Sequence, residues 1–103
     1  MTIKNCYFDG GSAAISAIKA TNGYFSGDIH IEGTTFINHH ATDYTVVFGL
    51  PSGANIYAGT GIIKTVKFLT NTATTVKGAF EFRGHATTAM TSATITGNIL
   101  TSW

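Results

Sequence analysis

Five carboxylates could support acid–base chemistry in this sequence: Asp9, Asp28, Glu32, Asp43 and Glu81. A glycosidase places two such groups roughly 5 to 10 Å apart across the bond it cleaves. Asp28, His30 and Glu32 follow one another at every second position, which in a strand puts them on one face. Such a strip could bind or hydrolyse a glycan. In a depolymerase, Asp28, Glu32 or Asp43 would take the acid and base roles. The plainer alternative is a solvated outer face.

The histidines and the single cysteine indicate no metal or nucleophilic site. A zinc site needs three or four converging ligands, but the neighbours His39 and His40 point opposite ways in an extended chain. The spacing of all four histidines matches no metal pattern, so we expect neither a metal nor a cofactor. The one arrangement left open is a trimer in which a single histidine near the axis supplies three equivalent ligands. Cys6 has no base nearby in the sequence, and we expect it to be a small buried hydrophobe.

Aromatic and polar side chains in long loops are better candidates for ligand contact, because sugar recognition combines aromatic faces with hydrogen-bonding groups. Tyr44 follows the loop 39–43, and Tyr57 follows the turn 51–55. Loops on a regular scaffold often form the binding face. We therefore predict a glycan-binding site drawn from Tyr44, Tyr57, Asp43, Arg83 and Trp103.

The composition limits what these side chains can serve. The 103 residues amount to one domain, residues 1–103. Only 11% are charged, against about 25% in an average globular chain. With a net charge of +1, the chain offers little attraction for nucleic acid or anionic membranes. One cysteine excludes an intrachain disulfide. Eighteen threonines, together with Ile, Val, Phe and Tyr, favour strands, and we expect no helix.

An internal repeat organises those strands. Four segments begin with isoleucine and carry a large apolar residue five positions later: 3–10, 31–38, 63–70 and 95–102. Within each segment the inward-facing parity breaks after the isoleucine, as in a strand that turns a corner. The third position would be that corner, and Asn and Gly enter left-handed geometry there at low cost. The corner residues are Asn5, Gly33, Thr65 and Gly97.

Stacked isoleucine and phenylalanine ladders of this kind predict a β-solenoid. Three further strands are expected between the repeats, at residues 14–18, 44–48 and 79–82. Each coil would then contain about three strands.

The segments 3–8, 31–36 and 95–98 resemble the strand–corner–strand unit of the pectate-lyase-like right-handed parallel β-helix. The Thr- and Gly-rich, charge-poor and Cys-poor character is most similar to bacteriophage tailspike and tail-fibre proteins. The resemblance implies an all-β, short right-handed parallel β-helix of about three to four coils. It also implies a homotrimer, intertwined or side by side, that binds a bacterial surface glycan. Tailspike subunits are several times longer, so we expect a C-terminal fragment of a longer chain or a small domain whose open ends its trimer partners cover. Trp103 would be part of a cap.

The expected function is therefore a structural and host-recognition segment of a phage tailspike or tail fibre, located in the virion. Its partners would be its own copies and a bacterial polysaccharide, with no nucleic acid and no membrane insertion. Two alternatives stay open. One is a fragment of a polysaccharide depolymerase, either a lyase or a glycosidase. The other is a passenger fragment of a bacterial adhesin at the cell surface.

Overall fold

A computed structural model describes residues 1–20, 27–40, 44–48, 63–74, 76, 78, 80–82 and 90–101. Strands make up 62% of these residues and none of them is helical, so the expected all-β class is confirmed. Within the same ranges, no helix has the length and apolar character needed to cross a membrane.

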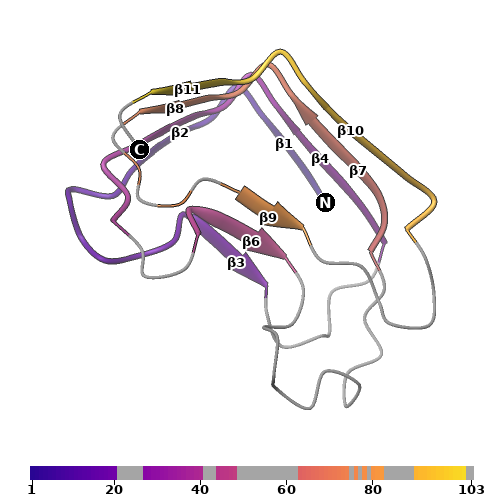
Figure 1. The fold of residues 1–103 in the computed structure, drawn as a ribbon, viewed down its shortest axis with the longest axis horizontal. Coiled ribbons are helices and arrows are strands. Elements are labelled where there is room, and N and C mark those ends of the chain that lie inside the picture. Colours follow the sequence, from indigo (N-terminus) through magenta and orange to yellow (C-terminus); the bar gives the residue numbers. More distant parts are fainter. Residues whose placement is uncertain are drawn as a thin grey trace.

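The strands form three parallel sheets, which we call A, B and C (Figure 1). Sheet A has the order β1 (Thr2–Lys4), β4 (Gly27–Glu32), β7 (Ile63–Leu69) and β10 (Ser92–Thr96). Sheet B has β2 (Tyr7–Asp9), β5 (Thr35–Ile37), β8 (Thr72–Thr74) and β11 (Ile99–Thr101). Sheet C has β3 (Ile18–Ala20), β6 (Val46–Phe48) and β9 (Phe80–Phe82). The chain visits A, B and C in turn and then repeats the circuit one strand further along, as a β-solenoid does.

The ladder on sheet A differs from the expected one at its third member. Ile3 pairs with Ile31, Ile31 pairs with Phe68, and Phe68 pairs with Ile95. Ile63 is opposite Gly27 instead, so the prediction that Ile63 belongs to the isoleucine ladder is wrong. Equivalent positions are 28 residues apart between the first two coils, then 37, then 27.

A β-bulge explains this error. The register of β4 and β7 shifts between Gly27 and Asp28, where Lys64 is the extra residue. A bulge breaks the alternation of inward and outward side chains just as a corner does. The parity break after Ile63 is therefore the bulge, and the true corner follows at the end of β7.

The corners themselves have the predicted backbone geometry. Positive φ angles occur at Asn5 (52°), Gly33 (59°), Thr70 (52°) and Gly97 (66°). The predictions at Asn5, Gly33 and Gly97 are confirmed, whereas the third corner is Thr70 and not Thr65. These residues stack closely, because a Cβ added to Gly33 would lie 2.5 Å from the Asn5 Oδ1 atom.

The position after each corner forms a column of Cys6, Thr34, Asn71 and Asn98. The buried Asn71 side chain accepts from the Thr34 amide (2.9 Å) and donates to the Ile31 carbonyl (3.0 Å). Asn98 repeats both bonds one strand further along, on the Asn71 amide and the Phe68 carbonyl (2.9 Å each). Cys6 is exposed, so the expectation of a buried thiol is wrong. It occupies the column at the end of the stack, where none of the described strands covers it.

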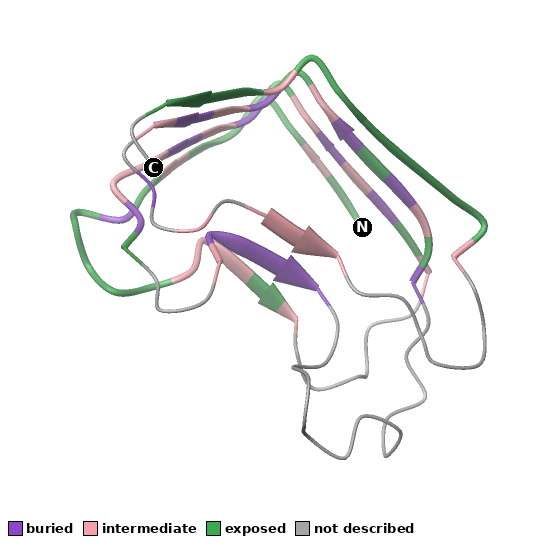
Figure 2. Ribbon diagram, viewed as in Figure 1, coloured by how far each residue is buried: buried purple, intermediate pink, exposed green. Residues whose placement is uncertain are grey.

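Apolar side chains of all three sheets meet between them. Ile29, Ile31, Phe36, Phe48, Val66 and Phe68 are almost fully buried there. Phe8 stacks on Phe36 with ring centres 5.3 Å apart. The expected strands 44–48 and 79–82 correspond to β6 and β9, whereas β3 begins only at Ile18 and Ile15 is 52% exposed. Burial is greatest on the middle strands, and β10 and β11 are exposed along their length (Figure 2).

Candidate functional site

The outer face of sheet A carries the charged strip predicted from the sequence. In β4 the side chains of Ile29 and Ile31 are buried (1% and 0% exposed), so Asp28, His30 and Glu32 face outward. Strand alternation alone produces this arrangement. The predicted placement of the three side chains on one outer face is confirmed.

Lys4 and His30 hold Glu32 at one end of the strip. The Lys4 Nζ atom lies 3.2 Å from the Glu32 Oε2 atom, and the His30 Nε2 atom lies 2.9 Å from the same oxygen. The hydrogen bond from Lys4, its positive charge and the His30 contact lower the pKa of Glu32 below its ordinary value of 4.5. A carboxyl with a lowered pKa stays ionised at neutral pH, so it is poorly suited to act as a general acid.

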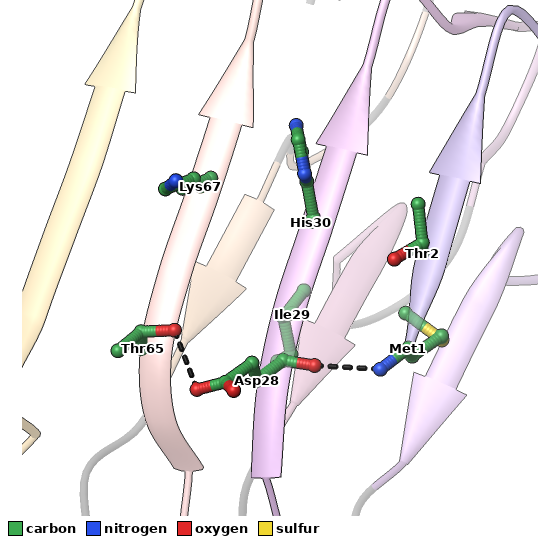
Figure 3. Close-up of a pocket in the computed structure, with 7 residues that line it drawn as sticks. All are labelled: Met1, Thr2, Asp28, Ile29, His30, Thr65 and Lys67. Carbon is green, nitrogen blue, oxygen red and sulfur yellow. Dashed lines mark hydrogen bonds between the residues drawn. The ribbon is translucent and has the colours of Figure 1, made fainter.

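A shallow depression of about 430 Å³ lies at the other end of the strip (Figure 3). The Thr65 hydroxyl donates to the Asp28 carboxylate across it (2.6 Å). Lys67 lies opposite His30 in the register of β4 and β7, and it forms no ion pair with any described residue. The depression therefore combines a hydrogen-bonded carboxylate with an ammonium group that has no ion-pair partner in the described part of the chain. Its lining is Met1, Thr2, Asp28, Ile29, His30, Thr65 and Lys67.

Four of the five sequence-predicted glycan residues lie outside the described residues: Asp43, Tyr57, Arg83 and Trp103. Tyr44 lies just before β6 of sheet C, where its carbonyl accepts from the Ser16 hydroxyl (2.7 Å), and it does not line the depression. Thr65 and Lys67 were not predicted as site residues. Their only signal in the sequence was the alternation with the apolar residues Val66 and Phe68.

The other described acid and imidazole groups, Asp9, His39, His40 and Glu81, do not line the depression. Among the residues that the structure describes, no group of three His, Cys, Asp or Glu side chains could hold a metal ion. His39 is buried (2% exposed) with its Nε2 atom 3.3 Å from the Phe8 carbonyl, in the turn after β5. It lies far along the chain from the strip on β4 and contributes nothing to it.

No protein-family model, curated protein or solved structure matches this chain.

Proposed function

We propose that this chain is a rigid segment of a tailspike- or tail-fibre-like protein that binds a bacterial surface polysaccharide on the outer face of sheet A. The observation that carries the proposal is the depression between Asp28, His30, Thr65 and Lys67. Hydroxyl, carboxylate, imidazole and ammonium groups meet there, and sugar hydroxyls can both donate to and accept from such a set. The groups project from paired strands, so little ordering is needed when a ligand binds.

The proposal includes a right-handed β-helix of about three to four coils, a homotrimer and a place in the phage tail. The resemblance of the repeats to tailspike coils supports it, as does the outer face of sheet B. That face presents Tyr7, Ile37, Ile99 and threonines, with Asp9 as its only charged residue among those described. Three copies side by side would convert weak single-site contacts into avid binding.

The test is direct binding of the 103-residue chain to purified bacterial capsule and lipopolysaccharide by titration calorimetry. Losing one charged hydrogen bond weakens binding by about tenfold or more. We therefore expect Lys67→Ala and Asp28→Asn each to weaken binding by at least this factor. Lys64→Ala is the matched control, because Lys64 is an exposed lysine of the same strand and does not line the depression.

Two results would overturn the proposal. One is that the unmodified chain binds none of the polysaccharides. The other is that Lys64→Ala weakens binding as much as Lys67→Ala does.

A depolymerase receives less support from the same strand. Asp28 and Glu32 are four residues apart in β4, which separates their backbones by about 13 Å. That span is wider than a glycosidase pair requires, and Glu32 stays ionised. Release of reducing sugar from the bound polysaccharide would nevertheless favour this alternative, and its loss in Asp28→Asn would assign the carboxylate.

A further inference from the structure

Within the part of the chain that the structure describes, the two ends of the stack are strand edges of matching pattern that have no partner strand. At one end, β10 and β11 each pair along a single edge, and the inward side chains of Ile95 and Leu100 are 56% and 38% exposed. At the other end, β1 and β2 likewise each pair along a single edge, and Met1 is 42% exposed. We propose that the β10–β11 end of one copy of this chain stacks on the β1–β2 end of a second copy. Sheets A and B would then continue across the junction.

The first argument is a series of backbone hydrogen bonds at the corners. The Asn5 amide donates to the Glu32 carbonyl (3.0 Å). In the next two coils, the Gly33 amide donates to the Leu69 carbonyl (3.1 Å), and the Thr70 amide donates to the Thr96 carbonyl (3.0 Å). Each corner thus donates to the residue before the corner of the next coil. Gly97 is the fourth corner, and the equivalent acceptor is the Lys4 carbonyl of a second copy.

A second series runs through sheet B in the opposite sense. The Thr35 amide donates to the Cys6 carbonyl. In the same way, the Thr72 amide donates to the Thr34 carbonyl, and the Ile99 amide donates to the Asn71 carbonyl (2.9 Å each). The next acceptor is the Asn98 carbonyl, and the next donor is the Tyr7 amide of a second copy. Each end of the molecule therefore carries one donor and one acceptor that match those of the other end.

The side-chain columns also match across this junction. Ile95 would lie against Ile3 of the second copy, as Ile31 lies against Ile3 within the chain. Leu100 would cover Phe8, which is the end of the Phe8–Phe36 column. Gly97 and Asn5 share the left-handed backbone geometry (66° and 52°). On the outer faces Thr96 would meet Lys4, and Thr101 would meet Asp9, so no like charges face each other.

One column is imperfect, and it provides a test. Inside the chain, the backbone amide after each corner donates to a side-chain oxygen of the next coil. The Cys6 amide donates to the Thr34 Oγ1 atom, the Thr34 amide to the Asn71 Oδ1 atom, and the Asn71 amide to the Asn98 Oδ1 atom. The Asn98 amide would meet Cys6 of the second copy, whose sulfur is a weak acceptor. Asparagine at position 6 would supply the missing Oδ1 atom. Its Nδ2 atom would reach the Ile95 carbonyl, as Asn98 reaches Phe68.

The experiment is sedimentation velocity of the 103-residue chain across three decades of concentration, with a reductant present to exclude disulfides through Cys6. A head-to-tail junction leaves two free ends after every addition, so it produces open-ended growth. We expect the mean mass to rise with concentration without reaching a plateau. We expect Ile95→Glu to abolish this growth, and Cys6→Asn to move it to at least tenfold lower concentration.

Thr94→Glu is the matched control, because Thr94 neighbours Ile95 in β10 but faces outward next to Lys67; it should associate like the unmodified chain. A mass that stays constant at all concentrations, whether of a monomer or of a closed trimer, overturns the proposal. So does growth that Cys6→Asn leaves unchanged, which would indicate unspecific aggregation. That variant keeps the proposal testable even if Ile95→Glu does not fold, because position 6 is exposed.

Discussion

Asn71 is a polar side chain that the interior of this solenoid depends on. It is 1% exposed, and its amide group satisfies the Thr34 N–H and the Ile31 carbonyl, which lie on either side of the Gly33 corner. Removing a partner leaves each buried backbone group without its hydrogen bond, at about 1–3 kcal/mol per group. We predict that Asn71→Ala lowers the free energy of unfolding by about 2–4 kcal/mol, measured by urea denaturation followed by circular dichroism.

Asn98→Ala provides the comparison for that measurement. Asn98 makes the same pair of bonds but is only partly buried and lies at the open end of the stack. Water can replace its contacts there, so the loss should be about 1 kcal/mol. Equal losses in the two variants would mean that burial does not determine the strength of the column.

Thr70 is strained by the corner that it forms. A left-handed backbone costs an L-residue roughly 1–2 kcal/mol, whereas glycine adopts it freely. Part of the gain from glycine is offset by the greater freedom of the unfolded chain. We predict that Thr70→Gly raises the free energy of unfolding by about 0.5–1 kcal/mol, measured by thermal denaturation.

The control is Thr72→Gly, two residues later in β8, where φ is not positive and glycine should destabilise the strand. A loss of stability in Thr70→Gly would contradict the interpretation of this corner. The same chemistry explains which corners were predictable. Left-handed backbone geometry is common for asparagine and glycine, so the corners at Asn5, Gly33 and Gly97 could be predicted. It is rare for a β-branched threonine, so the corner at Thr70 could not.

At the scale of the element, the misassigned third repeat shows what a periodic pattern can determine. The alternation in β7 predicted a strand with buried Val66 and Phe68, and the structure confirms both. The alternation could not distinguish a bulge from a corner, because each of them shifts the inward-facing positions by one residue. The pairing partner of Phe68 therefore depended on coil length, which no local pattern encodes.

The candidate site was predictable to the same extent. The outward strip of β4 follows from alternation within a single strand. The neighbours that make it a depression, Thr65 and Lys67, come from β7 and depend on the register across the bulge. The repeat in the sequence was misaligned by five residues at β7. It therefore could not show that Thr65 and Lys67 lie beside Asp28 and His30.

The turn after β2 should make stability depend on acid. The Asp9 carboxylate accepts from the Gly11 amide (2.8 Å) and from the Asn38 side chain (3.2 Å), and these bonds lower the pKa of Asp9 below 3.8. A pKa that is lower in the folded than in the unfolded chain stabilises the fold above pH 3.8, and this contribution is lost as pH falls through the folded value. The lowered pKa of Glu32 likewise stabilises the fold above pH 4.5, and this contribution is lost as pH falls through the folded value.

We predict that the thermal midpoint of the unmodified chain falls as pH is lowered from about 6 to about 2. Asp9→Asn should weaken this dependence, because the amide does not titrate. Asp28→Asn is the control, since it also removes one exposed carboxylate but leaves the turn intact. If Asp9→Asn and the unmodified chain lose stability in parallel, the turn does not contribute to the acid response.

At the scale of the whole molecule, stability is distributed from the middle of the stack outward. The strands β4 and β7 pair on both edges and cover the most buried side chains, whereas β10 and β11 pair on one edge and are exposed. In a solenoid each coil is stabilised mainly by its neighbours, so an end coil opens at lower free energy than a central one.

Hydrogen exchange read by mass spectrometry separates this gradient from the proposed stacking. In dilute solution, peptides from β10 and β11 should exchange fastest among the sheet strands, and those from β4 and β7 slowest. If copies stack head to tail, raising the concentration should slow exchange in β1, β2, β10 and β11 together, while β4 and β7 serve as internal references.

A side-by-side trimer would instead change exchange evenly along sheet B. Exchange that does not vary with concentration in any strand would exclude both assemblies. Because only the end strands can gain an edge partner in a stack, joint protection of the two ends is the specific signature of that assembly.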